Sequence, residues 1–175
     1  MPAADTIARR LLPEFDREMA GARVALERAP EDRYDWKPHE KSWTLRELIT
    51  HIAQLPQWGS MALDASELDL EPVGAPRPMK AVPVRSRAEL LGRFDAHVAA
   101  ARAALERASD EHMGGTWELK MGGRTIRSMT RRAVLRGFVL SHLIHHRAQL
   151  GVYLRLCDVP VPMQYGPTAD EGTMG

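Results

Sequence analysis

The feature that most constrains this chain is the long segment from Ala133 to Leu156, which holds three of its seven histidines. The segment contains no proline and its apolar residues recur with a helical period, so it predicts one long helix. Residues four apart on a helix stack on one face, which pairs His142 with His146. An apolar interior penalises imidazoles that lack partners, and a divalent metal ion would supply a partner for both.

Three further segments show helical periodicity. Helices are predicted at about residues 5–28, 44–65, 86–108 and 130–156. The second has the clearest start signal, because Thr44 and Glu47 have the spacing of a capping box. Pro56 is expected to kink this helix or to end its regular part, although the segment continues to about residue 65.

A segment of some twenty residues, Ser66 to Arg85, separates the second and third predicted helices. Its composition predicts an extended, helix-free linker, because it carries Pro72, Pro76, Pro78 and Pro83. At ~3.1 Å per residue such a linker easily covers the ~30 Å length of a helix. It can therefore act as a crossover, and the two helices that it joins would then run parallel.

The segment from Thr116 to Ile126 alternates around Gly122-Gly123, which indicates a small hairpin. The tail, residues 157–175, is rich in proline and glycine and is predicted to be non-helical. Four amphipathic helices with little strand signal predict an all-α fold, a four-helix bundle. The length of 175 residues suits a single domain over residues 1–175.

The charge of the chain is balanced, with 24 Lys+Arg against 23 Asp+Glu, so the composition does not favour nucleic acid as a partner. No apolar run approaches the ~20 residues of a membrane span, and the N-terminus lacks a signal-peptide core. We therefore expect a cytoplasmic location and no membrane partner. A single cysteine, Cys157, excludes an internal disulfide and a cysteine-rich zinc site.

A metal site on the fourth helix needs a third ligand, and His51 is the candidate. It shares a predicted helix face with Leu48, Ile52 and Leu55, so it is expected to point inward. The alternative is a core histidine that is hydrogen-bonded to a backbone carbonyl. Three buried imidazoles without a metal would each need a separate partner, which favours the metal site.

Spacing alone leaves open whether His145 or His146 partners His142, since both fall on stripes with helical spacing. The usual helical chelate has histidines four residues apart, which favours His146. The remaining histidines are not assigned to a metal: one lies in a Pro-rich turn, one flanks the stripe of the third helix, and one lies in a predicted loop. They are His39, His97 and His112.

Three motifs, in this order along the chain, resemble the DinB/YfiT-like family. The first reads Trp-Lys-Pro-His-Glu-Lys-Ser-Trp-Thr-Leu-Arg-Glu-Leu-Ile-Thr-His-Ile-Ala over residues 36–53. The second reads Ser-His-Leu-Ile-His-His-Arg-Ala-Gln-Leu over residues 141–150, and the third reads Val-Pro-Met-Gln-Tyr-Gly-Pro-Thr-Ala-Asp-Glu over residues 161–171. The departures are small: Ala148 stands where the family commonly has glycine, and Thr168 where it commonly has serine.

The resemblance implies a set of metal ligands. The family's first metal histidine falls on His51, and the two of its fourth-helix signature fall on His142 and His146. The resemblance also implies a metal-binding four-helix bundle, often homodimeric, with an up-down-down-up path. That path agrees with the long Pro-rich crossover between the second and third helices.

Three neutral imidazoles leave a tetrahedral ion with one open position, which is the arrangement of catalytic rather than structural zinc sites. Imidazole suits several divalent metals, and zinc or nickel is favoured here. We expect a small-molecule substrate, and either a metal-dependent hydrolase or a transferase that uses a low-molecular-weight thiol. The alternatives are a stress-associated metal-binding protein with a structural or vestigial site, and an interaction module whose histidines are only packed.

No general acid or base is evident. Glu47, one turn before His51, could reach water at the metal, but its place in the capping box already accounts for it. Gln149 and Tyr153 continue the ligand stripe and could line a pocket or pack in the core. Arg147 is predicted to hold the tail against the fourth helix by pairing with an acidic residue of the tail, Asp170 or Glu171.

Overall fold

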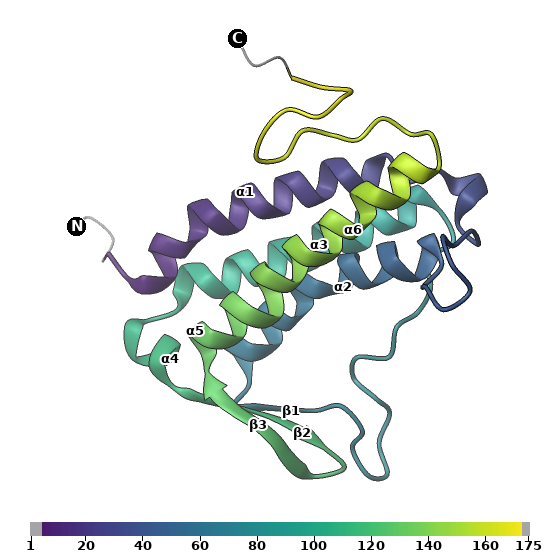
Figure 1. Ribbon diagram of the computed structural model, residues 1–175. Helices are drawn as coiled ribbons and strands as arrows, with labels where there is room; N and C mark the ends of the chain where they lie inside the picture. The colour runs from purple at the N-terminus through teal and green to yellow at the C-terminus, as the bar shows by residue number, and fades with distance from the viewer. Residues whose placement is uncertain (1–4, 173–175) are drawn as a thin grey trace.

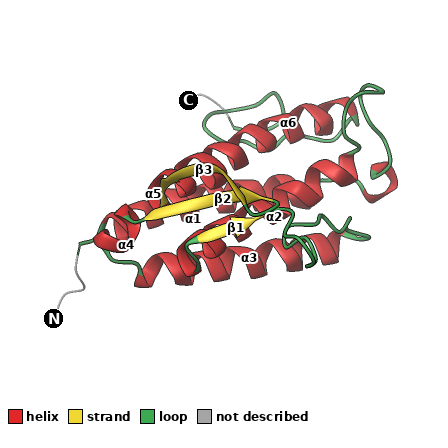
Figure 2. Cartoon of the chain, turned by 90° about the horizontal axis from the view of Figure 1, so that it is seen from below, coloured by secondary structure: helices red, strands yellow, loops and turns green. Residues whose placement is uncertain are grey.

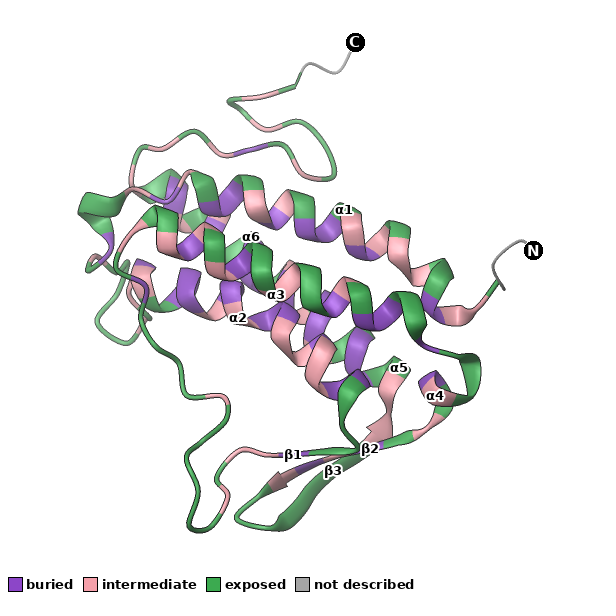
Figure 3. Ribbon diagram, turned by 180° about the vertical axis from the view of Figure 1, so that it is seen from behind, coloured by how far each residue is buried: buried purple, intermediate pink, exposed green. Residues whose placement is uncertain are grey.

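The computed structural model describes residues 5–172, and the chain is mostly helical. Four long helices lie side by side (Figure 1): α1 (Ile7–Glu27), α2 (Leu45–Asp64), α3 (Arg87–Arg107) and α6 (His142–Leu156). In Figure 1, α1 and α6 run in one direction while α2 and α3 run in the other. Their buried residues gather where the helices face one another, and they form one continuous apolar core (Figure 3).

The first three helices begin at capping residues. Thr6, Thr44 and Ser86 each accept a hydrogen bond from the backbone N–H three residues further on, which satisfies an otherwise unpaired donor. Thr44 and Glu47 complete the predicted capping box, because the Thr44 N–H also donates to the Glu47 carboxylate at 2.7 Å. These three predicted helices are confirmed, and α2 continues through the buried Pro56 to its end.

The expectation of an all-α fold is wrong in one respect, because a small three-stranded sheet packs beside the helices (Figure 2). It consists of β1 (Glu67–Asp69), β2 (Thr116–Met121) and β3 (Arg124–Thr130), in that spatial order. β2 is antiparallel to β3, which confirms the predicted hairpin, and parallel to β1. β1 was missed because three residues in a Pro-rich segment carry too little periodicity to mark a strand.

The hairpin turn explains why β1 forms where it does. Gly122 and Gly123 both have positive φ, at 61° and 78°, as a two-residue turn between antiparallel strands requires. Their backbone N–H groups donate to the Asp69 carboxylate at 3.0 and 2.6 Å. Asp69 therefore ties β1 to the turn, while Leu68 packs with the buried Trp117 in a second, smaller apolar cluster.

The predicted fourth helix is divided into three parts. It comprises α5 (Arg131–Val134), a π-helical segment (Leu135–Ser141) and α6, which begins at His142. A π-helix contains more residues per turn than an α-helix and often occurs beside functional sites. Periodicity did not reveal it, because its apolar residues Leu135, Val139 and Leu140 are buried and fit a continuous helical stripe.

Two short helices complete the described elements: a 3₁₀-helix at Glu31–Arg33 and α4 at Asp110–Gly114. Ser109 caps α4 by accepting a hydrogen bond from the His112 N–H, so the predicted loop around His112 contains a helical turn. Within residues 5–172, none of the helices has the length and apolar character needed to cross a membrane.

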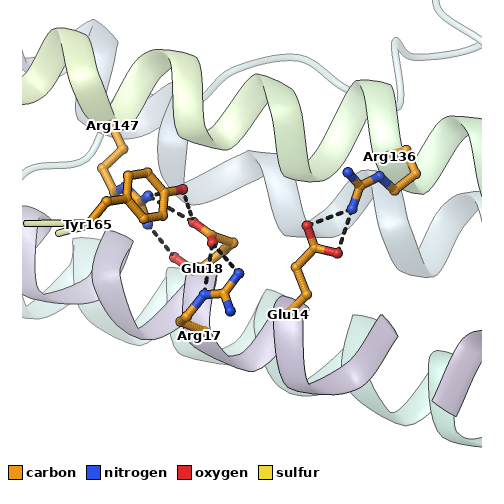
Figure 4. A network of polar contacts seen from close by, with 6 residues as sticks. All are labelled: Glu14, Arg17, Glu18, Arg136, Arg147 and Tyr165. Carbon is orange, nitrogen blue, oxygen red and sulfur yellow. Dashed lines mark hydrogen bonds and ion pairs between the residues drawn. The ribbon is translucent and has the colours of Figure 1, made fainter. Parts of the chain in front are cut away.

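A buried ion pair joins α1, α6 and the tail (Figure 4). The guanidinium of Arg147 lies 2.8 Å from the carboxylate of Glu18, and their side chains are only 4% and 2% exposed. The Tyr165 hydroxyl donates to Glu18 at 2.6 Å and accepts from Arg147 at 2.7 Å. Arg147 therefore does hold the tail, as predicted, but through a tyrosine.

The predicted pairing of Arg147 with a tail carboxylate is wrong. Asp170 pairs with Arg155 instead, and Glu171 pairs with Arg28. The physical reason is burial: Arg147 is directed into the α1–α6 contact, where the equally buried Glu18 needs a cationic partner. Asp170 and Glu171 stay nearer the solvent and are met there by arginines at the ends of α6 and α1.

Candidate metal centre

The structure brings His51, His142 and His146 together. His51 lies on α2, while His142 and His146 lie one turn apart at the start of α6. The Nε2 atom of His142 is 3.3 Å from that of His51 and 2.9 Å from that of His146. Their candidate ligand atoms all lie within 4.8 Å of one another. Three imidazoles from two helices thus converge on one point.

His145 does not join this group. It is exposed, and its ring lies against the outer side of His146 with the ring centroids 4.8 Å apart. The pair that faces His51 is therefore the one four residues apart. The other unassigned histidines have different partners: His39 Nδ1 accepts from Lys41 N–H, His97 meets the Ala53 carbonyl, and His112 meets the Leu63 carbonyl.

The three clustered histidines favour the neutral form. Burial, and then the neighbouring His146 and His142, lower the pKa of His51 to about 4. Burial also lowers the pKa of His142 and of His146. A hydrogen bond to the Phe138 backbone partly offsets this shift for His142, and a hydrogen bond to the Gln149 side chain does so for His146. Neutral imidazoles keep a free ring lone pair, which is the state that binds metal.

The hydrogen bond of His146 decides which of its nitrogens can bind a cation. Its Nδ1 lies 2.7 Å from Oε1 of the Gln149 side-chain amide, an oxygen that can only accept, so Nδ1 carries the proton. The lone pair of His146 is then on Nε2, directed at His142. An outer hydrogen bond of this kind is the usual companion of a metal-binding histidine.

The separations of the nitrogens also suit a metal ion. Ligand nitrogens at about 2.05 Å from a tetrahedral zinc lie roughly 3.3 Å apart. The observed Nε2 separations are 3.3 Å and 2.9 Å. Lone pairs at such distances repel unless a proton or a cation lies between them. The chemistry of the donor set therefore fits a divalent cation.

No carboxylate among the described residues completes the group, which consists of histidines alone. Glu47 belongs to the capping box of α2. Its carboxylate accepts hydrogen bonds from the backbone N–H and the hydroxyl of Thr44, and these lower its pKa, the backbone bond more strongly. The predicted capping role therefore accounts for Glu47. Gln149 and Tyr153 line a cavity beside His146, which was the first of the two predicted roles. Tyr153 also packs against the main apolar core, which was the second.

Trp43 is the residue that the sequence did not assign to the site. It directly precedes the cap of α2, and its ring stacks on His146 with centroids 5.5 Å apart and planes 19° apart. It also meets His51 edge-on at 5.2 Å. No helical period predicts this contact, because Trp43 precedes the helix and reaches a histidine about one hundred residues away.

Comparison with known proteins places the chain in a family. The DinB superfamily matches residues 14–150, well over half of the chain and all three clustered histidines, so the chain belongs to the DinB superfamily. A DinB-like protein from Bacillus subtilis is 20% identical, with a TM-score of 0.68 over 89% of this chain and 96% of that one. A DinB-like protein from Bacillus cereus is 19% identical, and its structure gives a TM-score of 0.67 over 93% of this chain and 100% of that one. No curated protein matches the chain.

The lowered pKa of His51 predicts how the metal-free protein responds to acid. Its folded-state pKa is below the ordinary 6.5, so the unfolded chain binds the proton first as pH falls. This contribution to stability is complete above about pH 6.5 and is lost as pH falls towards about 4. Thermal melts between about pH 6.5 and pH 4 should show the Tm falling as the pH falls, and the Tm of His51→Gln should depend less steeply on pH. Equal slopes for both proteins would contradict the prediction.

Proposed function

We propose that this DinB protein holds one divalent metal ion, zinc or nickel, through His51, His142 and His146 and uses it to catalyse a reaction of a small molecule. The reaction is either metal-dependent hydrolysis or transfer to a low-molecular-weight thiol. The observation that carries the proposal is the convergence of three neutral imidazoles, with no fourth protein ligand among the described residues. Closed structural zinc sites normally have four protein ligands.

A divalent ion held by three imidazoles supplies a Lewis acid that acidifies water or a thiol and polarises a carbonyl group. The surrounding residues have distinct roles around it. Gln149 orients His146 by accepting a hydrogen bond from its Nδ1–H, and the indole of Trp43 covers His146 and His51. Tyr153, whose hydroxyl donates to the Trp43 carbonyl at 2.9 Å, places a phenol in the cavity next to His146.

The architecture belongs to the same proposal. The four long helices, with two running each way, support an up-down-down-up four-helix bundle. The tail pinned to α1 and α6 supports a single domain over residues 1–175. A homodimer, common in the family that the chain resembles, is also proposed, and sedimentation velocity on the untagged protein tests it. A monomer at micromolar concentration would contradict the dimer and leave the metal site unaffected.

One observation favours a second function. Oε2 of Glu47 is engaged in the cap of α2 and the pKa of this carboxyl is lowered, so the carboxylate nearest along the chain to His51 is a weak base. A stress-associated metal-binding protein with a structural or vestigial site needs no such base. In that case the bound ion would not activate a substrate.

The test compares metal-loaded and metal-free protein against a panel of low-molecular-weight thiols combined with electrophiles, and against esters and amides. We expect turnover that depends on the metal and is lost in His51→Ala. A stoichiometric ion without turnover, and without displacement of its solvent ligand by any thiol, would instead establish the second function. Absence of a stoichiometric ion would overturn both.

Gln149→Leu is expected to lower the metal affinity by about 10–100-fold, because it removes the acceptor that orients His146. Gln149→Glu keeps an acceptor and should stay close to wild type. Gln149 is exposed, so neither change should unfold the protein. Competition with a chromophoric chelator measures the affinities. Equal affinities for Gln149→Leu and wild type would show that this hydrogen bond does not orient a ligand.

A further inference from the structure

We propose that Trp43 is the specificity-determining residue of the three-histidine site and sets the size of the ligands that reach it. The inference rests on the proposed function, since it describes access to the same site. Three observations carry it: the packing of the indole on two of the histidines, the anchoring of its backbone, and the two cavities that it separates.

The indole contacts the site from outside. It stacks on His146 and meets His51 edge-on, so it touches ligands from both α6 and α2. It is nevertheless 46% exposed, which is unusual for so large an apolar ring. An apolar residue just before a helix cap commonly packs on the fourth residue of the helix, here Leu48, and that contact alone would not place the indole on two histidines. Contact with two histidines and with solvent at once is what an entrance requires.

The backbone of Trp43 is held firmly. Its carbonyl accepts from the Tyr153 hydroxyl at 2.9 Å, and Tyr153 packs edge-on against Trp36 at 5.7 Å. The next residue, Thr44, is fixed by the capping box. These contacts hold the backbone of Trp43 on its carbonyl side, so a change in the position of the indole would require rotation of its side chain rather than movement of the loop.

Two cavities meet at the indole. One, of about 260 Å³, lies on the His146 side and is also lined by Lys41, Ser42, Gln149 and Tyr153. The other, of about 200 Å³, lies on the His51 side and is also lined by Glu47, Thr50, Ala81 and Pro83. Among the described residues, Trp43 alone lines both. The indole therefore stands between an approach beside His146 and an approach beside His51.

The size of these cavities defines the ligand class. Each is smaller than the ~300–1,000 Å³ of a typical pocket for a drug-sized ligand. With the indole in place, each approach admits a small molecule. The approach beside His146 offers hydroxyl, amide and ammonium groups, so it suits a small polar or anionic substrate. Removal of the indole joins the two spaces and admits larger ligands.

The first test needs no metal. Diethyl pyrocarbonate modifies neutral, accessible imidazoles, and mass spectrometry of the metal-free protein follows each histidine separately. In wild type we expect His146 to react at least about tenfold more slowly than its exposed neighbour His145, and Trp43→Ala to narrow this ratio severalfold because the indole stacks on His146. Trp36→Phe is the matched control, since Trp36 packs on Tyr153 and should leave the ratio unchanged. An unaltered ratio in Trp43→Ala would overturn the proposal.

The second test uses cobalt(II)-loaded protein and two ligands, imidazole and 4-phenylimidazole, followed by visible absorption. Wild type should bind imidazole more than about tenfold more tightly than 4-phenylimidazole, and Trp43→Ala should narrow this ratio to below about threefold. An equal ratio in both proteins would refute the role of Trp43. Failure of every variant to bind cobalt would overturn the proposed metal site, while the modification rates would still judge Trp43.

Discussion

His142→Ala is expected to lower the affinity of the protein for a divalent ion by at least about 100-fold. Its Nε2 is the central atom of the cluster, 3.3 Å from that of His51 and 2.9 Å from that of His146. A structural zinc site contributes about 10–16 kcal/mol over four ligands, so one imidazole accounts for roughly 3 kcal/mol, or about 100-fold in affinity. Competition titration of the untagged protein measures the change.

His145→Ala is the matched control for this prediction. It also removes one imidazole from the same turn of α6, but an exposed one that lies outside the cluster. Its metal affinity should stay within about threefold of wild type, since the ring of His145 lies against His146 but outside the cluster of three. Loss of the ion in His145→Ala together with its retention in His142→Ala would reverse the ligand assignment.

Arg147→Ala is expected to lower the free energy of unfolding by about 3–5 kcal/mol, because it leaves the carboxylate of Glu18 buried without its main counterion. The remaining partners are a hydroxyl and the largely exposed Arg17. The loss also frees the tail at Tyr165. Urea denaturation followed by circular dichroism measures the effect, and an unchanged midpoint would contradict it.

Arg136→Ala provides the comparison, in an ion pair between α1 and the π-helical segment that precedes α6 (Figure 4). Arg136 also pairs with a glutamate of α1, Glu14, but its side chain is 50% exposed. Water already solvates such a pair, so the expected cost is only about 0–1 kcal/mol. Similar losses in Arg136→Ala and Arg147→Ala would mean that burial does not set the strength of these contacts.

The stability contributed by Glu18 should also depend on pH. Burial alone would raise its pKa, but hydrogen bonds from Tyr165 and Arg147 outweigh burial, and the net shift is below the ordinary 4.5. A lowered carboxylate pKa gives stability that is complete above about pH 4.5 and is lost as pH falls through the folded-state value. The difference in free energy of unfolding between wild type and Arg147→Ala should therefore become smaller as the pH falls below about 4.5.

The helices with clear start signals were predictable because their signals are local. Thr44 and Glu47 lie three residues apart, and each finds its partner within one turn of the chain. The same holds for the Gly122-Gly123 turn, whose positive φ angles suit glycine. Features of this kind depend on neighbours in sequence, so they can be read without knowing the fold.

The features that were missed depend on distant neighbours. β1 forms because Asp69 caps a turn more than fifty residues away, and nothing in a Pro-rich segment announces such a partner. An acidic residue of the tail was predicted to form an ion pair with Arg147, but Arg147 pairs with the buried Glu18 of α1. Burial decides which of several acidic residues an arginine meets, and burial follows from the packing of whole helices.

The candidate site lies between these two cases. The helix face shared with Leu48, Ile52 and Leu55 indicated His51. Spacing alone left His145 and His146 open as the partner of His142, and the resemblance to a family selected His146. The acceptor that selects the tautomer of His146, Gln149, was in the same motif, but its direction follows from packing. The contact between Trp43 and His146 required the structure, because the loop before α2 and the start of α6 meet only in the folded chain.

The central claim is that three histidines hold a metal ion and leave one position open. X-ray absorption spectroscopy of the zinc- or nickel-loaded protein tests it most directly. We predict three imidazole nitrogens at about 2.0–2.1 Å and a further light ligand that a sulfur at about 2.3 Å replaces when a small thiol is added to the zinc form. A site with four protein ligands, unchanged by the thiol, would contradict the open position, and an ion without imidazole ligands would contradict the site itself.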